Sequence, residues 1–536
     1  MHKDIDIVLT PKQACIASEL KKIVSEKARI KEKDIVSLRF IRKSIDARRS
    51  DVKINARLRV YVGFEDEKPF EETKFSNLCK KDVIVVGSGP AGLFAALTLL
   101  ENGLRPIILE RGKDVHERKK DTANLNRNGV LDENSNYAFG EGGAGAFSDG
   151  KLYTRSDKRG DVKKVLSLFC QHGANNDILF ESHPHIGTEK LPKVIENIRS
   201  TIINYGGEVH FNTLVTCLIK RNNEVIGVET TKGEFFGPVI LATGHSSHDV
   251  YDFLNRDGYS LEAKDVAIGV RLEHPQRLID EIQYHSMEGR GKYLPAAQYS
   301  FVTQVNDRGV YSFCMCPGGF IVPATTKNGY QVVNGMSPSN RNGKWANSGM
   351  VVQLRCSDIE VNSPLSMLEY IKSVEKRCYF DNFKAPSQRM ADFINHKISD
   401  ALPPSSYIPG LVSVNLDDYL PPIVSSSLRE GLLKFSSFTR GKFLTNDALL
   451  LAPETRTSSP VRISRNEGLF QIKGLYPCGE GAGYAGGIVS AALDGIMCAT
   501  KLKENYLWKF LITVKVIMIY YLKLILYFLL RELFQL

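Results

Sequence analysis

The 536-residue chain contains ten cysteines but no C-x-x-C pair. This absence argues against zinc ribbons and thioredoxin-type redox sites, and we expect no metal site. Cys314 and Cys316 are the only two cysteines close together in the sequence. A long chain with scattered cysteines is typical of a reducing compartment, so we expect an intracellular, cytoplasmic protein.

Long hydrophobic runs are missing from most of the chain. The N-terminus carries acidic residues early and does not look like a secretory or transit peptide. The exception is residues 507–536, where Phe510 to Leu530 is long enough to span a bilayer. Two lysines in that stretch, Lys515 and Lys523, would each cost roughly 2.5–3.5 kcal/mol at the membrane centre. Three interpretations stay open: membrane association through this tail, an interfacial or partner-packed helix, and a segment foreign to the ancestral fold.

The excess of positive charge is small, +10 over the whole chain. A uniformly basic nucleic-acid binder would usually carry more, so a nucleic-acid partner is not expected. Residues 1–78 are locally basic and predict a small α/β domain, with a helix over Lys12–Lys27 and strands over Asp34–Ile45 and Val52–Phe64. Their basic residues form either a solvated strand face or a patch for RNA or an acidic partner. These residues are Arg39, Arg42, Lys43, Arg48, Arg49, Arg57 and Arg59.

A dinucleotide-binding unit begins after Lys81. An apolar strand, Asp82–Val86, is followed by the loop Gly87-Ser88-Gly89-Pro90-Ala91-Gly92, a helix to Glu101 and a second strand, Arg105–Glu110. The first glycine permits a tight turn, the second lets the backbone approach a pyrophosphate, and the third lets the helix pack on the strand. The helix N-terminus attracts the phosphates. Glu110 is expected to accept from the ribose hydroxyls.

Further segments favour FAD over NAD. Val239–Leu241 followed by Ala242-Thr243-Gly244 resembles the second FAD-contacting turn of the glutathione-reductase-type flavoproteins, and Gly479-Glu480 resembles their terminal motif. That motif usually has Asp where this chain has Glu480. A helix opening at Gly486-Gly487-Ile488 would direct its positive end at the flavin. The glycine-dense loop from Phe139 to Leu152 is expected beside the cofactor. The expected cofactor-binding residues are Gly87, Ser88, Gly89, Pro90, Ala91, Gly92, Glu110, Arg111, Gly142, Gly143, Val215, Ala242, Thr243, Gly244, Gly479, Glu480, Gly486, Gly487 and Ile488.

The region from about Asp265 to Leu451 has strand-like runs separated by Pro-Gly and Asn-Gly turns, which is an antiparallel pattern. Its expected strands are Val266–Leu272, Val310–Cys316, Phe320–Pro323, Tyr330–Met336 and Gly349–Leu354, and its expected helices are Pro364–Phe380 and Ser387–His396. We interpret it as an inserted substrate domain. The predicted organisation is 1–78 N-terminal domain, 79–264 and 452–502 FAD domain, 265–451 insertion and 503–536 hydrophobic tail.

The chain resembles the uncharacterised FAD-dependent dehydrogenases of bacteria and plastids, which are relatives of aminoacetone-oxidase-like flavoproteins. The stretches that carry the resemblance cover residues 30–500. They are Gly140–Leu152, His183–Thr188, Ala242–Ser246, Ile268–Pro275, Ser312–Gly319, Asn334–Ser337, Glu454–Pro460 and Gly479–Gly495. The resemblance implies an α/β fold: a glutathione-reductase-type, Rossmann-like FAD domain with an inserted, mainly antiparallel α+β domain. It supplies no substrate.

The sequence contains no second strand–G-x-G-x-x-G–helix unit, so a dedicated NAD(P) domain is not expected. Either a small-molecule substrate gives hydride directly to flavin N5, or NAD(P)H docks transiently. His245 is a candidate acid/base, and Lys151 could polarise flavin or substrate. Arg456 and Arg271 are candidates for a substrate carboxylate. His183 and His185 are weaker candidates, and Cys314 and Cys316 have either a redox or a buried apolar role.

The leading hypothesis is an FAD-dependent oxidoreductase, a dehydrogenase or oxidase, acting on a small and perhaps anionic molecule. A flavin-dependent RNA-modifying enzyme and a non-enzymatic FAD-binding redox sensor or scaffold are the alternatives. The sequence leaves the oligomeric state and the electron acceptor open.

Overall fold

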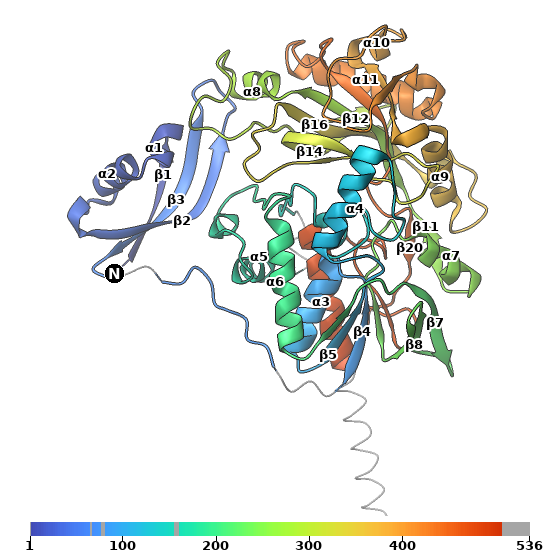
Figure 1. The fold of residues 1–536 in the computed structure, drawn as a ribbon. Helices are drawn as coiled ribbons and strands as arrows, with labels where there is room; N and C mark the ends of the chain where they lie inside the picture. Colours follow the sequence, from blue (N-terminus) through green and yellow to red (C-terminus); the bar gives the residue numbers. More distant parts are fainter. Residues whose placement is uncertain (1, 65–66, 77–80, 155–159, 506–536) are drawn as a thin grey trace, which may run out of the picture.

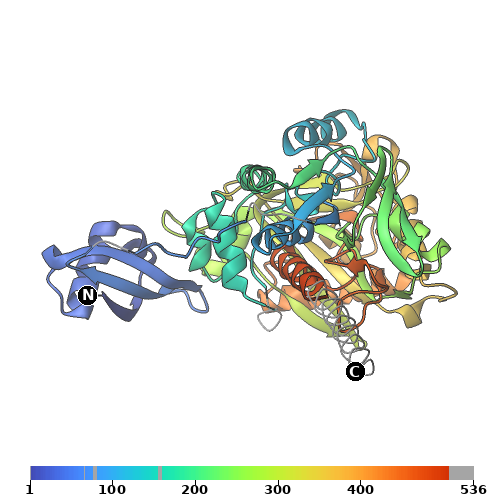
Figure 2. The same ribbon diagram turned by 90° about the horizontal axis from the view of Figure 1, so that it is seen from below.

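The computed structural model describes residues 2–64, 67–76, 81–154 and 160–505. An N-terminal domain lies at one side of the molecule (Figures 1 and 2), where the backbone of Lys43 forms hydrogen bonds with Phe180 and Ser182. In this domain a three-stranded antiparallel sheet of order β1-β3-β2 packs against helices α1 and α2, and α2 buries Leu20 and Val24. Its elements are β1 (His2–Leu9), α1 (Pro11–Cys15), α2 (Ala17–Ala28), β2 (Ile35–Asp46) and β3 (Lys53–Val62). The single helix expected over Lys12–Lys27 is broken, because Ile16 between α1 and α2 is extended.

The second domain is built on a five-stranded parallel sheet of order β21-β10-β4-β5-β6. Its strands are β4 (Asp82–Val86), β5 (Arg105–Leu109), β6 (Glu208–His210), β10 (Val239–Leu241) and β21 (Leu475–Pro477). The last strand therefore comes from the far end of the chain. Alternate residues of β4 enter different cores, Val83 and Val85 on one face and Ile84 and Val86 on the other. A sheet buried on both faces explains why the strands read as continuous apolar runs.

Helices cover the first face of this sheet (Figure 1). They are α3 (Pro90–Glu101), α5 (Val162–Gln171), α6 (Leu191–Asn204) and the helical residues 488–505, with α4 (Val115–Asn128) alongside. The other face packs on an antiparallel meander and on α7 (His248–Arg256). The meander strands are β7 (Val215–Arg221), β8 (Glu224–Thr230) and β9 (Gly233–Phe236).

The inserted domain is a large, mainly antiparallel sheet in the order β13-β14-β16-β12-β19-β17-β18, with β15 paired to β14. Its strands are β12 (Val266–Pro275), β13 (Val302–Val305), β14 (Arg308–Pro323), β15 (Val333–Met336), β16 (Trp345–Leu354), β17 (Ala385–Arg389), β18 (Leu411–Ser413) and β19 (Leu449–Glu454). The short pair β11 (Leu261–Ala263) and β20 (Val461–Ile463) joins the two ends of the insertion. Because β19 runs to Glu454, the insertion extends past the expected boundary at 451.

Helices pack against this sheet: α8 (Gln276–Tyr284), α9 (Ser366–Arg377), α10 (Met390–Ile394) and α11 (Pro422–Phe438). Two expectations were wrong here, and one helix was missed. Val310–Cys316 and Phe320–Pro323 are parts of one strand, β14. The helix expected over Ser387–His396 begins as strand β17, because Ser387 pairs with Leu451 of β19. The long helix α11 was not expected.

The architecture confirms the predicted fold class: a Rossmann-like domain interrupted by a mainly antiparallel insertion and preceded by a small α/β domain. Among the described residues, no helix is both long and apolar enough to cross a membrane. The hydrophobic tail expected at 507–536 lies outside those residues.

Candidate functional site

Each glycine of the strand-to-helix loop has a distinct physical reason to be glycine. Gly87 has φ +101°, and a Cβ there would lie 2.5 Å from the Ala242 carbonyl oxygen. A Cβ on Gly92 would lie 1.9 Å from the Gly87 carbonyl oxygen, so this residue lets α3 pack on the turn. Gly89 differs, because its Cβ would meet only the Cα of Gly143, at 3.8 Å. The close approach that Gly89 permits is therefore to something outside the protein.

A cavity of about 350 Å³ opens beside this loop and is lined from both ends of the chain. Most of the expected cofactor residues line it: Gly87, Gly89, Pro90, Ala91, Glu110, Arg111, Gly143, Val215, Ala242, Thr243, Gly244, Glu480, Gly486, Gly487 and Ile488. Ser88, Gly92, Gly142 and Gly479 lie behind this surface. There the N–H of Gly142 donates to the Ser88 carbonyl, and the N–H of Gly479 donates to Asp494.

Two helix N-termini open on the cavity. Gly89 is the N-cap of α3 and provides no side-chain cap, so the first N–H groups of the helix keep their capacity to bind an anion. Helical residues 488–505 begin at the opposite wall, where Gly486, Gly487 and Ile488 line the cavity. These two positive ends suit a diphosphate and an electron-rich ring.

Glu110 is buried and braces the loops around the cavity. One carboxylate oxygen accepts from the N–H of Ser88 at 3.0 Å and from its hydroxyl at 2.7 Å. The other accepts from the N–H groups of Gly112 and Gly140. The carboxylate thus already receives four hydrogen bonds from the protein, whereas the sequence had suggested ribose hydroxyls as its partners. Arg111, the next residue, pairs with Asp249 and lies over the ring of Phe139.

The Ala-Thr-Gly turn and the terminal motif meet at His245. The imidazole Nδ1 lies 3.6 Å from a carboxylate oxygen of Glu480, and both residues line the cavity. The other ring nitrogen, Nε2, is buried and has no hydrogen-bond partner among the described residues. A buried polar atom without a partner beside a cavity suits a site that a ligand completes. The residues that line the cavity therefore fit FAD.

Both candidate arginines already form ion pairs with carboxylates of the protein. Arg456 lines the cavity, but it is buried and makes two hydrogen bonds to Glu375, at 3.0 and 3.1 Å. Arg271 is fully buried and pairs with Glu454 at 3.2 Å. Because neither guanidinium is left unpaired, the structure does not support either as a ligand for a substrate carboxylate.

Lys151 lies in the cavity wall, with Nζ 3.1 Å from Asp149. Burial alone would lower the pKa of Lys151, but Cys316, Asp149 and Cys314 outweigh it and the pKa rises. Burial would raise the pKa of Asp149, but Lys151 and Arg341 hold it below its ordinary value. Both groups are therefore charged at neutral pH.

The insertion supplies a wall of the cavity that motif analysis could not assign. Its lining residues are Phe313, Cys314, Cys316, Asn334 and Gly335. They belong to stretches that carried the family resemblance, which was the only signal for Phe313, Asn334 and Gly335; Cys314 and Cys316 had also stood out as the only close pair of cysteines. Thr457, from the stretch Glu454–Pro460 that also carried the resemblance, lines the cavity as well.

Several other candidates lie elsewhere. His185 is hydrogen-bonded to the Ser339 carbonyl, and burial lowers its pKa. His183 lines a larger hollow, of about 1460 Å³, between the N-terminal domain and α5, which shares Tyr153 with the cavity. In the basic N-terminal domain, Arg57 and Arg59 form ion pairs with aspartates of β1. These pairs favour the solvated-face interpretation over a nucleic-acid patch.

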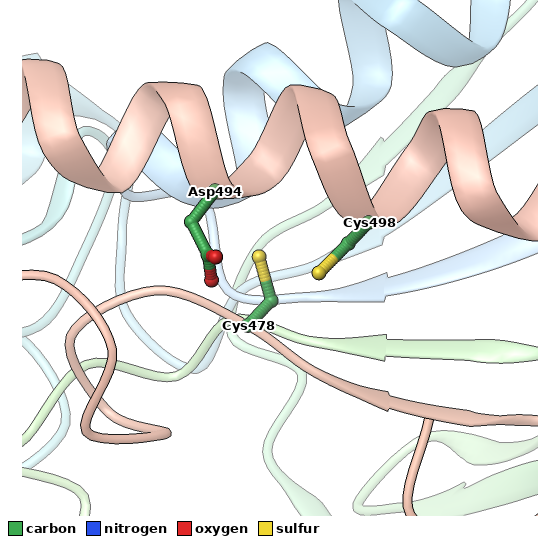
Figure 3. A group of neighbouring side chains, drawn as sticks. All are labelled: Cys478, Asp494 and Cys498. Atoms are coloured by element: carbon green, nitrogen blue, oxygen red, sulfur yellow. The ribbon is translucent and has the colours of Figure 1, made fainter. Parts of the chain in front are cut away.

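A buried group behind the terminal motif consists of Cys478, Asp494 and Cys498, all pointing toward one another (Figure 3). The guanidinium of Arg465 pairs with Asp494 at 2.7 Å and lies 3.6 Å from the sulfur of Cys498. The hydrogen bond with Cys498 and burial both raise the pKa of Cys478. Arg465 and Asp494 form a buried ion pair here, and Asp494 also accepts from the N–H of Gly479, so the group has a structural role.

Comparison with known families identifies three segments. Residues 82–117 match an FAD binding domain, residues 265–457 match the C-terminal domain-like family of FAD-dependent proteins, and residues 1–61 match a domain of unknown function. An uncharacterized protein of Clostridium beijerinckii is 40% identical over 515 residues, covering 91% of this chain and 96% of that protein.

Similar solved structures are distant. They include a geranylgeranyl bacteriochlorophyll reductase-like protein of Thermoplasma acidophilum (14% identity, TM-score 0.34, 80% of each chain) and a glycine oxidase of Bacillus cereus (13%, 0.27, 80% of this chain and 96% of that one). CtdE in complex with FAD is a third (11%, 0.31, 78% and 83%). These TM-scores are too low to carry an inference about substrate or mechanism. The relative and the matching segments nevertheless confirm the resemblance seen in the sequence: the chain belongs to a family of FAD-dependent proteins that includes the C. beijerinckii protein, and FAD is its cofactor.

Proposed function

We propose that the protein is an FAD-dependent oxidoreductase that transfers hydride between flavin N5 and a small molecule bound against the inserted domain. The observation that carries this proposal is one cavity in which the FAD-binding loop, a partnerless imidazole nitrogen and the wall of the insertion meet.

The chain's own residues have separable tasks in this proposal. The loop Gly87–Gly92 and the helix at 488–505 hold the cofactor by their N–H groups. His245, whose Nδ1 lies 3.6 Å from Glu480, is the residue that exchanges a proton with the substrate. Phe313 and Val250 line the cavity and exclude water from it. When bound, FAD supplies the hydride chemistry.

Both arginines proposed for an anionic substrate are neutralised by Glu375 and Glu454. We therefore propose a small substrate recognised mainly by shape and hydrogen bonding. Lys151 is paired with Asp149, but its side chain is 31% exposed, so it is the cation we propose to meet an anionic group. NAD(P)H remains a candidate transient donor, since it could reduce the flavin from the open side of the cavity.

Anaerobic reduction of the purified holoprotein tests the proposal. NADH, NADPH and a panel of amines, hydroxy acids and amino acids would be added one at a time while the flavin absorbance is followed. We expect at least one donor to bleach the flavin much faster than it bleaches free FAD. If every donor acts no faster than on free FAD, and the variant His245→Gln behaves like the wild type, the protein is not an oxidoreductase on these substrate classes.

A further inference from the structure

A fully buried arginine, Arg118 of α4, lies against the start of the glycine-dense loop that borders the flavin cavity. Its guanidinium donates to four main-chain carbonyls that lie within six consecutive residues. Nε donates to Asn136 at 2.7 Å, and Nη2 donates to Tyr137 at 3.0 Å. Nη1 donates to Gly140 at 3.2 Å and to Glu141 at 2.7 Å. Every hydrogen bond that this side chain makes within the described residues therefore goes to the backbone of one short segment.

The same guanidinium also contacts a later part of the loop. Its central carbon lies 5.0 Å from the centre of the Phe147 ring, so the aromatic face covers the cation. Gly140 shows how closely the arginine and the loop fit together. A Cβ at Gly140, where φ is +108°, would lie 2.5 Å from Cδ of Arg118. The missing side chain of Gly140 therefore leaves the room that Arg118 occupies.

The loop needs such a contact because of its composition. Phe139 to Leu152 contains five glycines. Glycine backbone has many accessible conformations, so ordering this loop costs more entropy than ordering an average sequence. The glycines also lack side chains that could pack and fix the loop. A planar guanidinium carries several N–H donors in a fixed fork, which suits it to hold several carbonyls in one arrangement.

A buried cation is costly, which argues against a role that a neutral side chain could fill. Burial lowers the pKa of Arg118 to about 10, while Glu110 and Glu141 act in the opposite direction. The guanidinium therefore stays charged at neutral pH. Buried ionic groups often add little net stability compared with well-packed apolar side chains. Net stability is thus a weak explanation of this arginine, and the position of the loop is a stronger one.

The segment that Arg118 holds reaches the flavin cavity directly. Ala138 and Phe139, between the held carbonyls, line the cavity. The N–H of Gly140 donates to Glu110, the buried carboxylate that also accepts from the loop after β4. A displacement of this segment would therefore change both the cavity wall and the loop at the N-terminus of α3.

We propose that Arg118 is a positioning residue for FAD, which holds the glycine-dense loop in the shape that receives the cofactor. A loop that the protein itself holds in place does not have to be ordered at the expense of binding free energy, so the affinity for FAD rises. The inference rests on FAD as the cofactor. It is independent of the proposed reaction, of the substrate and of the role of His245.

FAD titration and hydrogen exchange of the FAD-bound protein, read by peptide mass spectrometry, test the proposal. Arg118→Lys keeps the charge but replaces the planar fork by an ammonium group with fewer donors. We expect the amides of residues 136–152 to exchange faster than in wild type, while those of β12 and β16 keep their rates. FAD affinity should fall about tenfold, which corresponds to the loss of roughly one hydrogen bond from a charged donor.

Matched variants separate the loop from the fold. Arg127→Lys, on the same helix but exposed, should match wild type in both measurements. Arg308→Lys disturbs an ion pair with Asp358 in the insertion, so it should lower the thermal midpoint without changing FAD affinity. Phe147→Leu keeps a buried apolar side chain but removes the ring from the guanidinium face. It should weaken FAD binding in the same direction as Arg118→Lys, without loss of a buried charge.

Chemical rescue identifies the group that acts. Arg118→Ala should bind FAD weakly, and guanidinium chloride at a low, non-denaturing concentration should restore much of the affinity. Sodium chloride and urea at the same concentration should not, because neither supplies a planar cation with several donors. Equal rescue by urea and guanidinium would show that filling the space is sufficient, and would overturn the positioning role of the charged fork.

Two further results would contradict the proposal. The first is wild-type exchange in residues 136–152 together with wild-type FAD affinity in Arg118→Lys. The second is faster exchange over the whole chain, which would make Arg118 a stabiliser of the fold and not of the loop. Where Arg118→Lys does not fold, Phe147→Leu decides, and wild-type affinity and exchange in that variant would overturn the proposal. None of these results bears on whether the protein reduces or oxidises a substrate.

Discussion

Ser88 donates both its backbone N–H and its hydroxyl to one carboxylate oxygen of Glu110, at 3.0 and 2.7 Å. These hydrogen bonds connect the glycine loop after β4 to the end of β5. The second carboxylate oxygen accepts from the N–H groups of Gly112 and Gly140. The loop that we propose to hold the pyrophosphate is therefore positioned by a buried carboxylate that already accepts four hydrogen bonds.

Glu110→Gln should accordingly weaken both folding and FAD binding. The amide keeps the shape of the side chain but replaces one acceptor by an NH₂ group facing two donors, which costs roughly 3 kcal/mol of unfolding free energy. We expect FAD affinity to fall at least tenfold, measured by fluorescence titration of the reconstituted protein. Ser88→Ala removes only the hydroxyl donor and should cost about 1 kcal/mol. Equal effects of the two variants would contradict the bracing role.

Two glycines of the same loop should separate binding from folding. Gly89→Ala adds a methyl group that meets only the Gly143 Cα, at 3.8 Å, so stability should stay within about 0.5 kcal/mol while FAD affinity falls strongly. Gly92→Ala would bring its Cβ within 1.9 Å of the Gly87 carbonyl and should destabilise the fold itself. Urea unfolding of the apoprotein and FAD titration measure the two effects. Gly309→Ala, whose Cβ would be 3.9 Å from its nearest neighbours, is the matched control.

The Rossmann-like unit could be predicted from sequence because its signals are local. The strand Asp82–Val86, its turn and the helix ending at Glu101 are contiguous, and the need for glycine at position 92 arises within the loop itself, from the Gly87 carbonyl. The contact between Ala242 and Gly87 could also be predicted, because the carboxyl ends of neighbouring parallel strands lie at the same edge of a sheet.

The half of the cavity that we propose to bind substrate could not be predicted from sequence. The contacts that shape it join residues that are far apart in the chain. The sequence around Arg271 does not show that Glu454 pairs with it. The sequence around Arg456 likewise does not show that Glu375 pairs with it. Both arginines were therefore taken as available to bind a substrate. The bulge at Cys314 arises from the pairing of β14 with β16, which a sequence pattern of alternating residues does not reveal. Ser387 likewise becomes part of a strand because of its partner in β19 and not because of its own propensity.

The protein should lose stability as the pH is lowered, because a histidine of the insertion is buried. Burial lowers the pKa of His274 to about 4, against an ordinary value near 6.5, while its Nε2–H donates to the Phe443 carbonyl. Between these values the unfolded chain binds a proton that the folded chain does not, so stability is complete above about pH 6.5 and is lost as pH drops toward 4. The full loss is about 3 kcal/mol.

Denaturant unfolding of wild type and His274→Gln across pH 4 to 7.5 measures the contribution of His274 to the free energy of unfolding. The variant should be less stable than wild type at pH 7 but should lose less stability on acidification. His116→Gln on α4, with a side chain 69% exposed, should follow the wild-type curve. Parallel curves for wild type and His274→Gln would show that another group accounts for the acid sensitivity.

The strongest test of the catalytic assignment is His245→Gln. The imidazole Nε2 is the buried polar atom of the cavity without a partner in the described residues, and Glu480 lies at Nδ1. Loss of an acid/base group should lower the turnover number about a hundredfold or more. FAD content and thermal midpoint should stay close to wild type, because the side chain supports no other described hydrogen bond. His116→Gln controls for a general effect of losing a histidine. A turnover loss accompanied by an equal loss of bound FAD would make His245 a cofactor ligand, whereas an unchanged turnover would remove it from the reaction altogether.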